Sequence, residues 1–174
     1  MSAKIHVPTL KVMIEIPKGS RNKYEYDPVN DCIRFDRMLY SSVHYPCDYG
    51  FVTDTLAGDG DPLDVLVMVA EATFPGCMIE ARPVGLFIMK DEKGRDEKIL
   101  CVPVRDPLLN HVKSLRDVPP HLLTEIEHFF EIYKELENKV TEVEGWMGLP
   151  QALKVIRQSQ EAHQKSLARP AKRD

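Results

Sequence analysis

Residues 58–69 read Gly-Asp-Gly-Asp-Pro-Leu-Asp-Val-Leu-Val-Met-Val, a turn-forming block that leads directly into an apolar run. Two glycines and a proline favour a tight turn, and the apolar run is typical of a buried strand. The block also places three carboxylates, Asp59, Asp61 and Asp64, within six positions. Carboxylates held this close repel one another unless a cation lies between them, and Mg²⁺ is the hard, oxygen-preferring cation best suited to such a site.

Taken alone, the same block has a simpler interpretation as an exposed Asp/Gly turn without a ligand. A calcium-sensor loop is excluded, because an EF-hand needs an acid or Asn at its fifth position and Gly at its sixth. The chain has Leu63 and Asp64 at those positions. The residues around the block must therefore decide between a solvated turn and a metal site.

Short runs rich in β-branched and aromatic residues surround this block and are separated by clusters of Gly, Pro, Asn and Asp. This pattern predicts strands, and seven short strands favour a barrel or a sandwich. The predicted strands are Val12–Ile16, Lys23–Tyr26, Cys32–Met38, Asp48–Val52, Asp64–Val69, Met78–Met89 and Lys98–Val104.

The apolar period changes after Pro119-Pro120 to steps of three and four, which predicts an amphipathic helix. Its apolar stripe consists of Leu122, Leu123, Ile126, Phe129, Phe130, Tyr133 and Leu136. A second helix is expected to begin near Leu149-Pro150. We therefore expect an α+β, mainly β, fold, a β-barrel flanked by C-terminal helices. It forms one domain over residues 1–174 with flexible ends at about 1–10 and 166–174.

Composition narrows the function classes. The chain has 174 residues, 43% of them hydrophobic and 29% charged, and a net charge of −4, with a basic tail after Lys165. An acidic body lacks the positive field that nonspecific nucleic-acid binding needs, so no nucleic-acid partner is expected. No run approaches the roughly 18 apolar residues of a membrane span, and residues 1–10 lack an apolar signal core. We expect no membrane contact, reduced cysteines and a cytoplasmic location.

A second charged segment, residues 90–98, contains acids and bases in equal number. Alone, it predicts an exposed hairpin tip of mixed charge. If this tip folds towards residues 58–64, Asp91 and Asp96 complete a site for more than one metal ion.

Basic and phenolic residues within or beside the predicted strands form a third feature: Lys23, Arg37, Tyr45 and Tyr49. Lys, Arg and Tyr hydroxyl groups are donors suited to phosphate oxygens. Equally, the tyrosines can pack in the core while the basic side chains reach solvent. Glu15 interrupts an apolar strand, although strand alternation can place it outward.

Together, these segments resemble the family I soluble inorganic pyrophosphatases. The resemblance runs from about Val12 to Trp146 and rests on Ile14–Pro17, Lys23–Glu25, Asp36-Arg37, Tyr45–Gly50, Asp59–Asp64, residues 91–98 and His128–Lys134, in this order. It implies a five-stranded OB-like barrel flanked by helices, and hydrolysis of pyrophosphate to two phosphates with several Mg²⁺ ions.

The resemblance also implies a role for each matching residue. Asp59, Asp64, Asp91 and Asp96 match metal ligands, and Glu15 holds a further ion through water. Asp61 matches the general base that takes a proton from the attacking, metal-bridged water. The matching phosphate-binding residues are Lys23, Arg37, Tyr49, Lys98, Tyr133 and Lys134, and the residues that support them are Glu25, Tyr45 and Glu92. A homo-oligomer is expected, with a hexamer favoured.

Three positions, His44, Asp48 and Ile132, depart from the bacterial pattern of the family and leave the oligomeric state open. Two other functions compete with this interpretation. A hydrolase of nucleoside polyphosphates would need a pocket that stacks a base, and an OB-type module for single-stranded nucleic acid would need basic strands.

Overall fold

The computed structural model describes residues 6–168 of the chain. In chain order the elements are β1 (Leu10–Ile16), β2 (Asn22–Asp27), β3 (Cys32–Met38), β4 (Asp48–Val52), β5 (Asp64–Val67), β6 (Met78–Asp91), β7 (Gly94–Pro103), η1 (Leu115–Asp117), α1 (Pro120–Ile132), η2 (Glu135–Glu137), β8 (Glu142–Met147) and α2 (Leu149–Leu167).

Five strands close into a ring. Their order is β1-β4-β5-β7-β6, and β6 pairs back with β1 while also pairing with β8. The long strand β6 makes these pairings because its register shifts between Pro83 and Gly85, which allows it to bend from one neighbour to the next. Strands β5 and β7 run parallel, whereas the other pairs are antiparallel. This ring with its C-terminal helices confirms the predicted fold class.

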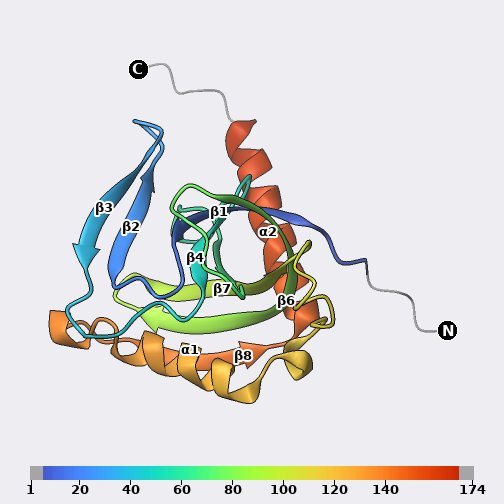
Figure 1. Cartoon of the computed structure of the whole chain (residues 1–174). Helices are drawn as coiled ribbons and strands as arrows, with labels where there is room; N and C mark the ends of the chain where they lie inside the picture. Colours follow the sequence, from blue (N-terminus) through green and yellow to red (C-terminus); the bar gives the residue numbers. More distant parts are fainter. Residues whose placement is uncertain (1–5, 169–174) are drawn as a thin grey trace, which may run out of the picture.

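The barrel wall is apolar on both faces. Along β5, Val65 and Val67 belong to one core cluster, which includes Ile156 of α2, and Leu66 belongs to a second cluster with Phe130 of α1. Alternate residues of a strand point to opposite faces, so a strand covered on both sides must be apolar at every position. The two helices therefore cover different sides of the barrel (Figure 1).

The hairpin β2–β3 forms a separate two-stranded sheet and extends away from the barrel (Figure 1). Its tip is held by Asp27, whose carboxylate accepts hydrogen bonds from the backbone N–H groups of Val29 and Asn30 at 2.9 and 3.1 Å. The hairpin leans on β1 through β2. It therefore adds a wall beside the barrel without joining the ladder of the main sheet.

Several element limits differ from the predictions. The helix extension to Leu136 was wrong: α1 ends at Ile132, and Leu136 is 61% exposed in the tighter turn η2. Asn138, with φ of 55°, follows in the left-handed region, which ends helical structure. Strand β8 was not predicted, because its polar Glu142 and Glu144 match no long apolar run.

The predicted flexible ends lie mostly outside the described residues. Within residues 6–168, Leu10 is buried at the start of β1, and α2 continues to Leu167. Among these described residues, no helix is both long and apolar enough to cross a membrane.

Replacing Gly50 by Ala should destabilise the barrel. Gly50 of β4 faces β1, and an added Cβ would lie 1.9 Å from the backbone oxygen of Met13. Backbone in a paired strand cannot move aside easily, so Gly50→Ala is expected to lower the free energy of unfolding by about 1–3 kcal/mol or more. Thermal unfolding measures this. Gly58→Ala is the matched control, since its Cβ meets nothing within 4 Å, and equal melting temperatures for the two variants would contradict the clash.

Candidate active site

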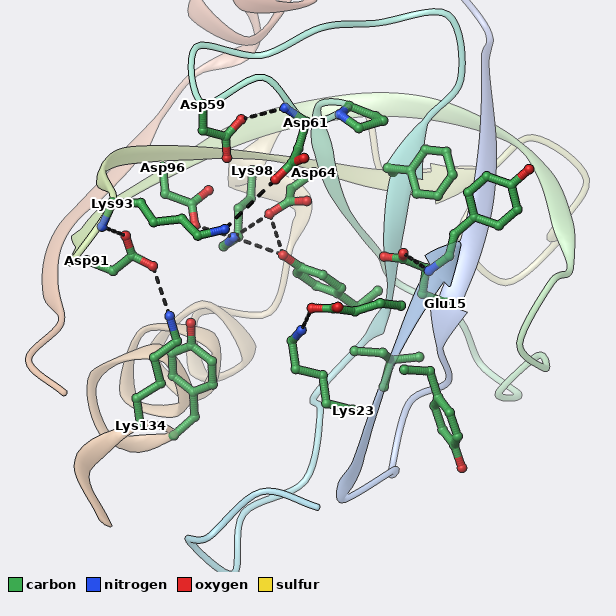
Figure 2. Close-up of a pocket in the computed structure, with 18 of the residues that line it drawn as sticks. Glu15, Lys23, Asp59, Asp61, Asp64, Asp91, Lys93, Asp96, Lys98 and Lys134 are labelled. Atoms are coloured by element: carbon green, nitrogen blue, oxygen red, sulfur yellow. Dashed lines mark hydrogen bonds and ion pairs between the residues drawn. The ribbon is translucent and has the colours of Figure 1, made fainter. Parts of the chain in front are cut away.

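A cavity of about 510 Å³ lies where the barrel, the β2–β3 hairpin and the end of α1 meet. Figure 2 shows charged side chains from these elements pointing into it. All of the predicted site residues except Tyr45 line the cavity, namely Glu15, Lys23, Glu25, Arg37, Tyr49, Asp59, Asp61, Asp64, Asp91, Glu92, Asp96, Lys98, Tyr133 and Lys134. The structure thus gathers residues that are up to 119 positions apart in sequence into one site.

The block of residues 58–64 is a tight turn, as predicted. Gly60 has a φ of 92°, a conformation that suits glycine, and the N–H of Asp61 donates to Asp59 Oδ1 at 3.1 Å. The N–H of Ala57 donates to the backbone oxygen of Asp61 at 2.7 Å, which closes the loop. Asp61 keeps its carboxylate 68% exposed on the cavity side. The turn therefore presents its acids to the cavity.

Lys98 is the buried centre of the site. Parallel pairing sets Lys98 of β7 directly beside Asp64 of β5, and the Lys98 side chain is 2% exposed. Its Nζ lies 2.7 Å from Asp64 Oδ2, 2.8 Å from Asp96 Oδ2 and 2.9 Å from the Tyr49 hydroxyl. Burial opposes its charge, but Asp64 and Asp96 together raise the pKa of Lys98, so it stays protonated.

Tyr49 links the Lys98 and Asp64 pair to the aromatic core. Its hydroxyl accepts from Lys98 and donates to Asp64 Oδ2, and burial raises the pKa of Tyr49 well above its usual value. Tyr45, the predicted site residue that does not line the cavity, is 2% exposed. Its ring packs against Tyr49 and Phe129 at centroid distances of 5.5 and 4.8 Å. Tyr45 therefore contacts the site through the Tyr49 ring.

The β6–β7 hairpin tip folds towards the turn of residues 58–64. Lys93 Nζ lies 3.9 Å from Asp61 Oδ2, and Lys134 Nζ lies 2.9 Å from Asp91 Oδ2 and 3.4 Å from Glu92 Oε1 (Figure 2). Burial of Asp91 acts to raise its pKa, but the hydrogen bond from Lys134 and other donors leave it below its usual value. The two acidic segments, residues 58–64 and 90–98, therefore line the same cavity, as the prediction of a shared site requires.

Glu15 of β1 and the hairpin strand β2 form the opposite wall. Glu15 Oε1 accepts the backbone N–H of Tyr26 at 2.7 Å. Burial is nevertheless the largest influence on Glu15 and raises its pKa to about 7, with Asp64 adding to the effect. Nearby, Lys23 pairs with Glu25 and, at 3.1 Å, with Asp36. A carboxylate with a raised pKa at a cavity wall is a group that a cation would stabilise.

Three basic residues that line the cavity were not among the predicted site residues: Lys93, Arg95 and Lys139. Lys93 and Arg95 lie in the segment of residues 90–98, whose balanced charge was the available signal. Lys139 follows η2 and pairs with Glu92 at 3.4 Å, a contact that no local pattern indicates.

The donor set fits hard divalent cations, although a closed metal cage is not preformed. Within residues 6–168, no three carboxylate, histidine or cysteine side chains converge on one point. Instead, ammonium groups lie between carboxylates, as Lys98 does between Asp64 and Asp96. The same carboxylate oxygens, which come from separate segments around one cavity, are ligands that a hard cation prefers.

Comparison with known proteins gives the site its family. The model of the inorganic pyrophosphatase family matches residues 12–164. The chain belongs to this family. Inorganic pyrophosphatases are enzymes that hydrolyse pyrophosphate and use divalent metal ions.

Individual inorganic pyrophosphatases are similar over nearly the whole chain. One from Methanosarcina mazei is 62% identical over 152 residues, which cover 87% of this chain and 90% of the relative, and one from Synechocystis is 54% identical over 147 residues, 84% of this chain and 87% of the relative. The solved structure of the Helicobacter pylori inorganic pyrophosphatase has a TM-score of 0.88 and 42% identity, and covers 92% of this chain and 99% of its own.

The raised pKa of Glu15 predicts a pH-dependent stability in the metal-free protein. The pKa of Glu15 is 4.5 in the unfolded chain, and burial raises it to about 7 in the folded protein. Between pH 4.5 and pH 7, Glu15 therefore binds more protons in the folded protein than in the unfolded chain. The stability that protonated Glu15 contributes at low pH is lost as the pH rises through about 7. Glu15→Gln, which keeps an oxygen for the Tyr26 N–H, should gain stability over the unaltered protein between pH 5 and pH 8.

Thermal unfolding in a chelator at both pH values measures that gain. Glu71→Gln, a change of the same type at an exposed residue outside the cavity, is the control. A difference between Glu15→Gln and the unaltered protein that stays constant with pH would contradict the assigned cause.

Proposed function

We propose that this chain hydrolyses pyrophosphate to two orthophosphates in the described cavity, with Mg²⁺ as its divalent cation. The observation that supports this most directly is that carboxylates and cationic side chains line the same cavity, with Lys98 buried between Asp64 and Asp96. Pyrophosphate is polyanionic and needs cationic side chains to neutralise its charge, whereas its metal ions need carboxylates to bind them.

The cationic and phenolic residues would bind the phosphates. Lys98, Lys134 and Arg37 are held by carboxylates at 2.6–2.9 Å and so keep their charge and their place. Lys23, Tyr49 and Tyr133 add further donors around the same space. Such donors stabilise the charge that spreads over the transferred phosphoryl oxygens and the leaving phosphate.

The residues proposed to hold metal ions are Asp59, Asp64, Asp91 and Asp96, with Glu15 acting through water. Their hard oxygen donors suit Mg²⁺. Bound divalent cations neutralise phosphate charge and lower the pKa of water, which makes a nucleophile available at neutral pH.

Asp61 is proposed as the general base. Its carboxylate is exposed to the cavity, its backbone is fixed by the turn, and Lys93 approaches it at 3.9 Å. A carboxylate placed in this way accepts the proton of the attacking water. Glu25 and Glu92 would support the site by pairing with Lys23 and Lys134, and Tyr45 would do so by packing on Tyr49.

We also propose a homo-oligomer, with a hexamer favoured, and a cytoplasmic location. Large apolar side chains at the surface, such as Phe74, Leu136 and Val140, offer material for contacts between copies. The free thiols of Cys47 and Cys101 suit a reducing compartment. Light scattering after size exclusion should give a mass several times 19.9 kDa, and a mass of one chain would overturn the oligomer.

Phosphate release from pyrophosphate tests the activity. With Mg²⁺ the unaltered protein should release phosphate rapidly, and Asp61→Asn should lower kcat by about 100-fold or more, the usual contribution of general acid–base catalysis. ATP, offered as a competing substrate, should be hydrolysed far more slowly. Faster release from ATP would favour a nucleotide hydrolase.

Asp54→Asn is the matched control for the base. Asp54 is exposed, lies outside the cavity and has a φ of 58°, a conformation that Asn also adopts. This variant should keep the kcat of the unaltered protein. If both Asp→Asn variants lose activity equally, Asp61 is not the base.

A further inference from the structure

Glu137 is a nearly buried carboxylate beside the cavity to which the family resemblance gives no role. Its side chain is 8% exposed and belongs to the short turn η2, which comes directly after Tyr133 and Lys134, the two residues that follow α1. The turn is fixed by its backbone: the N–H of Glu137 donates to the oxygen of Lys134 at 3.0 Å, and Asn138 ends the turn in the left-handed region.

The main partner of Glu137 is Arg37, which is 100 positions away in sequence. Arg37 Nε donates to Glu137 Oε1 at 2.9 Å, while Arg37 Nη1 donates to Asp36 Oδ2 at 2.6 Å. Two carboxylates on different edges of a planar guanidinium fix both its position and its plane. Among the described residues, Nη2 has no hydrogen-bond partner, and Arg37 lines the cavity.

This contact also joins two parts of the cavity wall. Arg37 comes from β3 of the separate hairpin, and Glu137 follows α1, whose C-terminal end lies beneath the base of the hairpin in Figure 1. The Ser41 hydroxyl donates to the oxygen of Ile132 at 3.1 Å and fixes the same junction. On its other side, Glu137 Oε2 lies 3.8 Å from Lys139 Nζ.

We propose that Glu137 is a positioning residue for the reaction, because it holds the Arg37 guanidinium with its free edge available to a phosphate oxygen. This inference rests on the proposed function. Asp36 alone binds one edge of the guanidinium and leaves it free to rotate about that bond. Glu137 removes that freedom, so the hydrogen bond from Arg37 to substrate forms without further ordering of the side chain.

Kinetics of three variants test the proposal with saturating Mg²⁺. Glu137→Ala should raise the KM for pyrophosphate about 10-fold, comparable to the loss of one charge-assisted hydrogen bond, with kcat within about threefold. Glu137→Gln keeps an oxygen acceptor for Arg37 Nε and should stay within about threefold of the unaltered KM. In an Arg37→Ala background, Glu137→Ala should raise KM no further, because the two residues act as a unit.

Glu135→Ala is the matched control, since Glu135 is exposed in the same turn and lies outside the cavity. It should leave KM and kcat unchanged. The proposal is overturned if Glu137→Ala lowers kcat in step with its melting temperature at constant KM, or if it raises KM equally with and without Arg37.

A measurement without turnover separates this inference from the proposed activity. Inorganic phosphate should raise the melting temperature of the unaltered protein by mass action, and Glu137→Ala should reduce that rise as much as Arg37→Ala does. If the unaltered protein and Glu135→Ala do not hydrolyse pyrophosphate, the proposed function fails. The phosphate-induced shifts then still decide the role of Glu137, and an undiminished shift in Glu137→Ala overturns it.

Discussion

The charged centre depends on one pairing, in which the parallel strands β5 and β7 place Asp64 beside Lys98. A buried ammonium group costs free energy unless carboxylates compensate it, and Asp64 and Asp96 do so at 2.7 and 2.8 Å. Because the barrel fixes both strands, these charges meet without any search by flexible loops. Tyr49 and Tyr45 then connect the charged centre to the aromatic core under α1.

Two other segments bring their acids to this centre from different directions. The turn of residues 58–64 leads directly into β5, whose first residue is Asp64, and the β6–β7 tip is carried by the long strand pair that ends at Asp91 and Gly94. The β6–β7 connection has only the residues 92–93, and the longer connection of residues 53–63 is closed by the hydrogen bond from the Ala57 N–H to the Asp61 backbone oxygen, so the carboxylates of both segments are held on the closed sheet. The barrel therefore positions the carboxylates on its side of the cavity, which suits a site that must hold several like charges close together.

The sequence predicted those features whose cause is local. Turn-forming residues were sufficient to predict the turn of residues 58–64, runs of β-branched and aromatic residues were sufficient for most strands, and the ordered set of motifs indicated the family. Contacts between distant segments were less accessible: Glu137 meets Arg37 only because η2 lies beneath the hairpin, and nothing near residue 137 indicates this. Strand β8 was missed for a related reason, since it is stabilised by pairing with β6 rather than by its own apolar pattern.

The separate β2–β3 hairpin gives the two walls of the cavity different stiffness. The barrel wall belongs to a closed hydrogen-bonded ring, whereas the hairpin wall is a two-stranded ribbon that is attached mainly through packing on β1 and the junction with α1. Bending such a ribbon breaks no ladder hydrogen bond of the ring. The width of the cavity therefore depends on the position of the hairpin relative to the barrel, and any movement of the hairpin carries Lys23 and Arg37 with it.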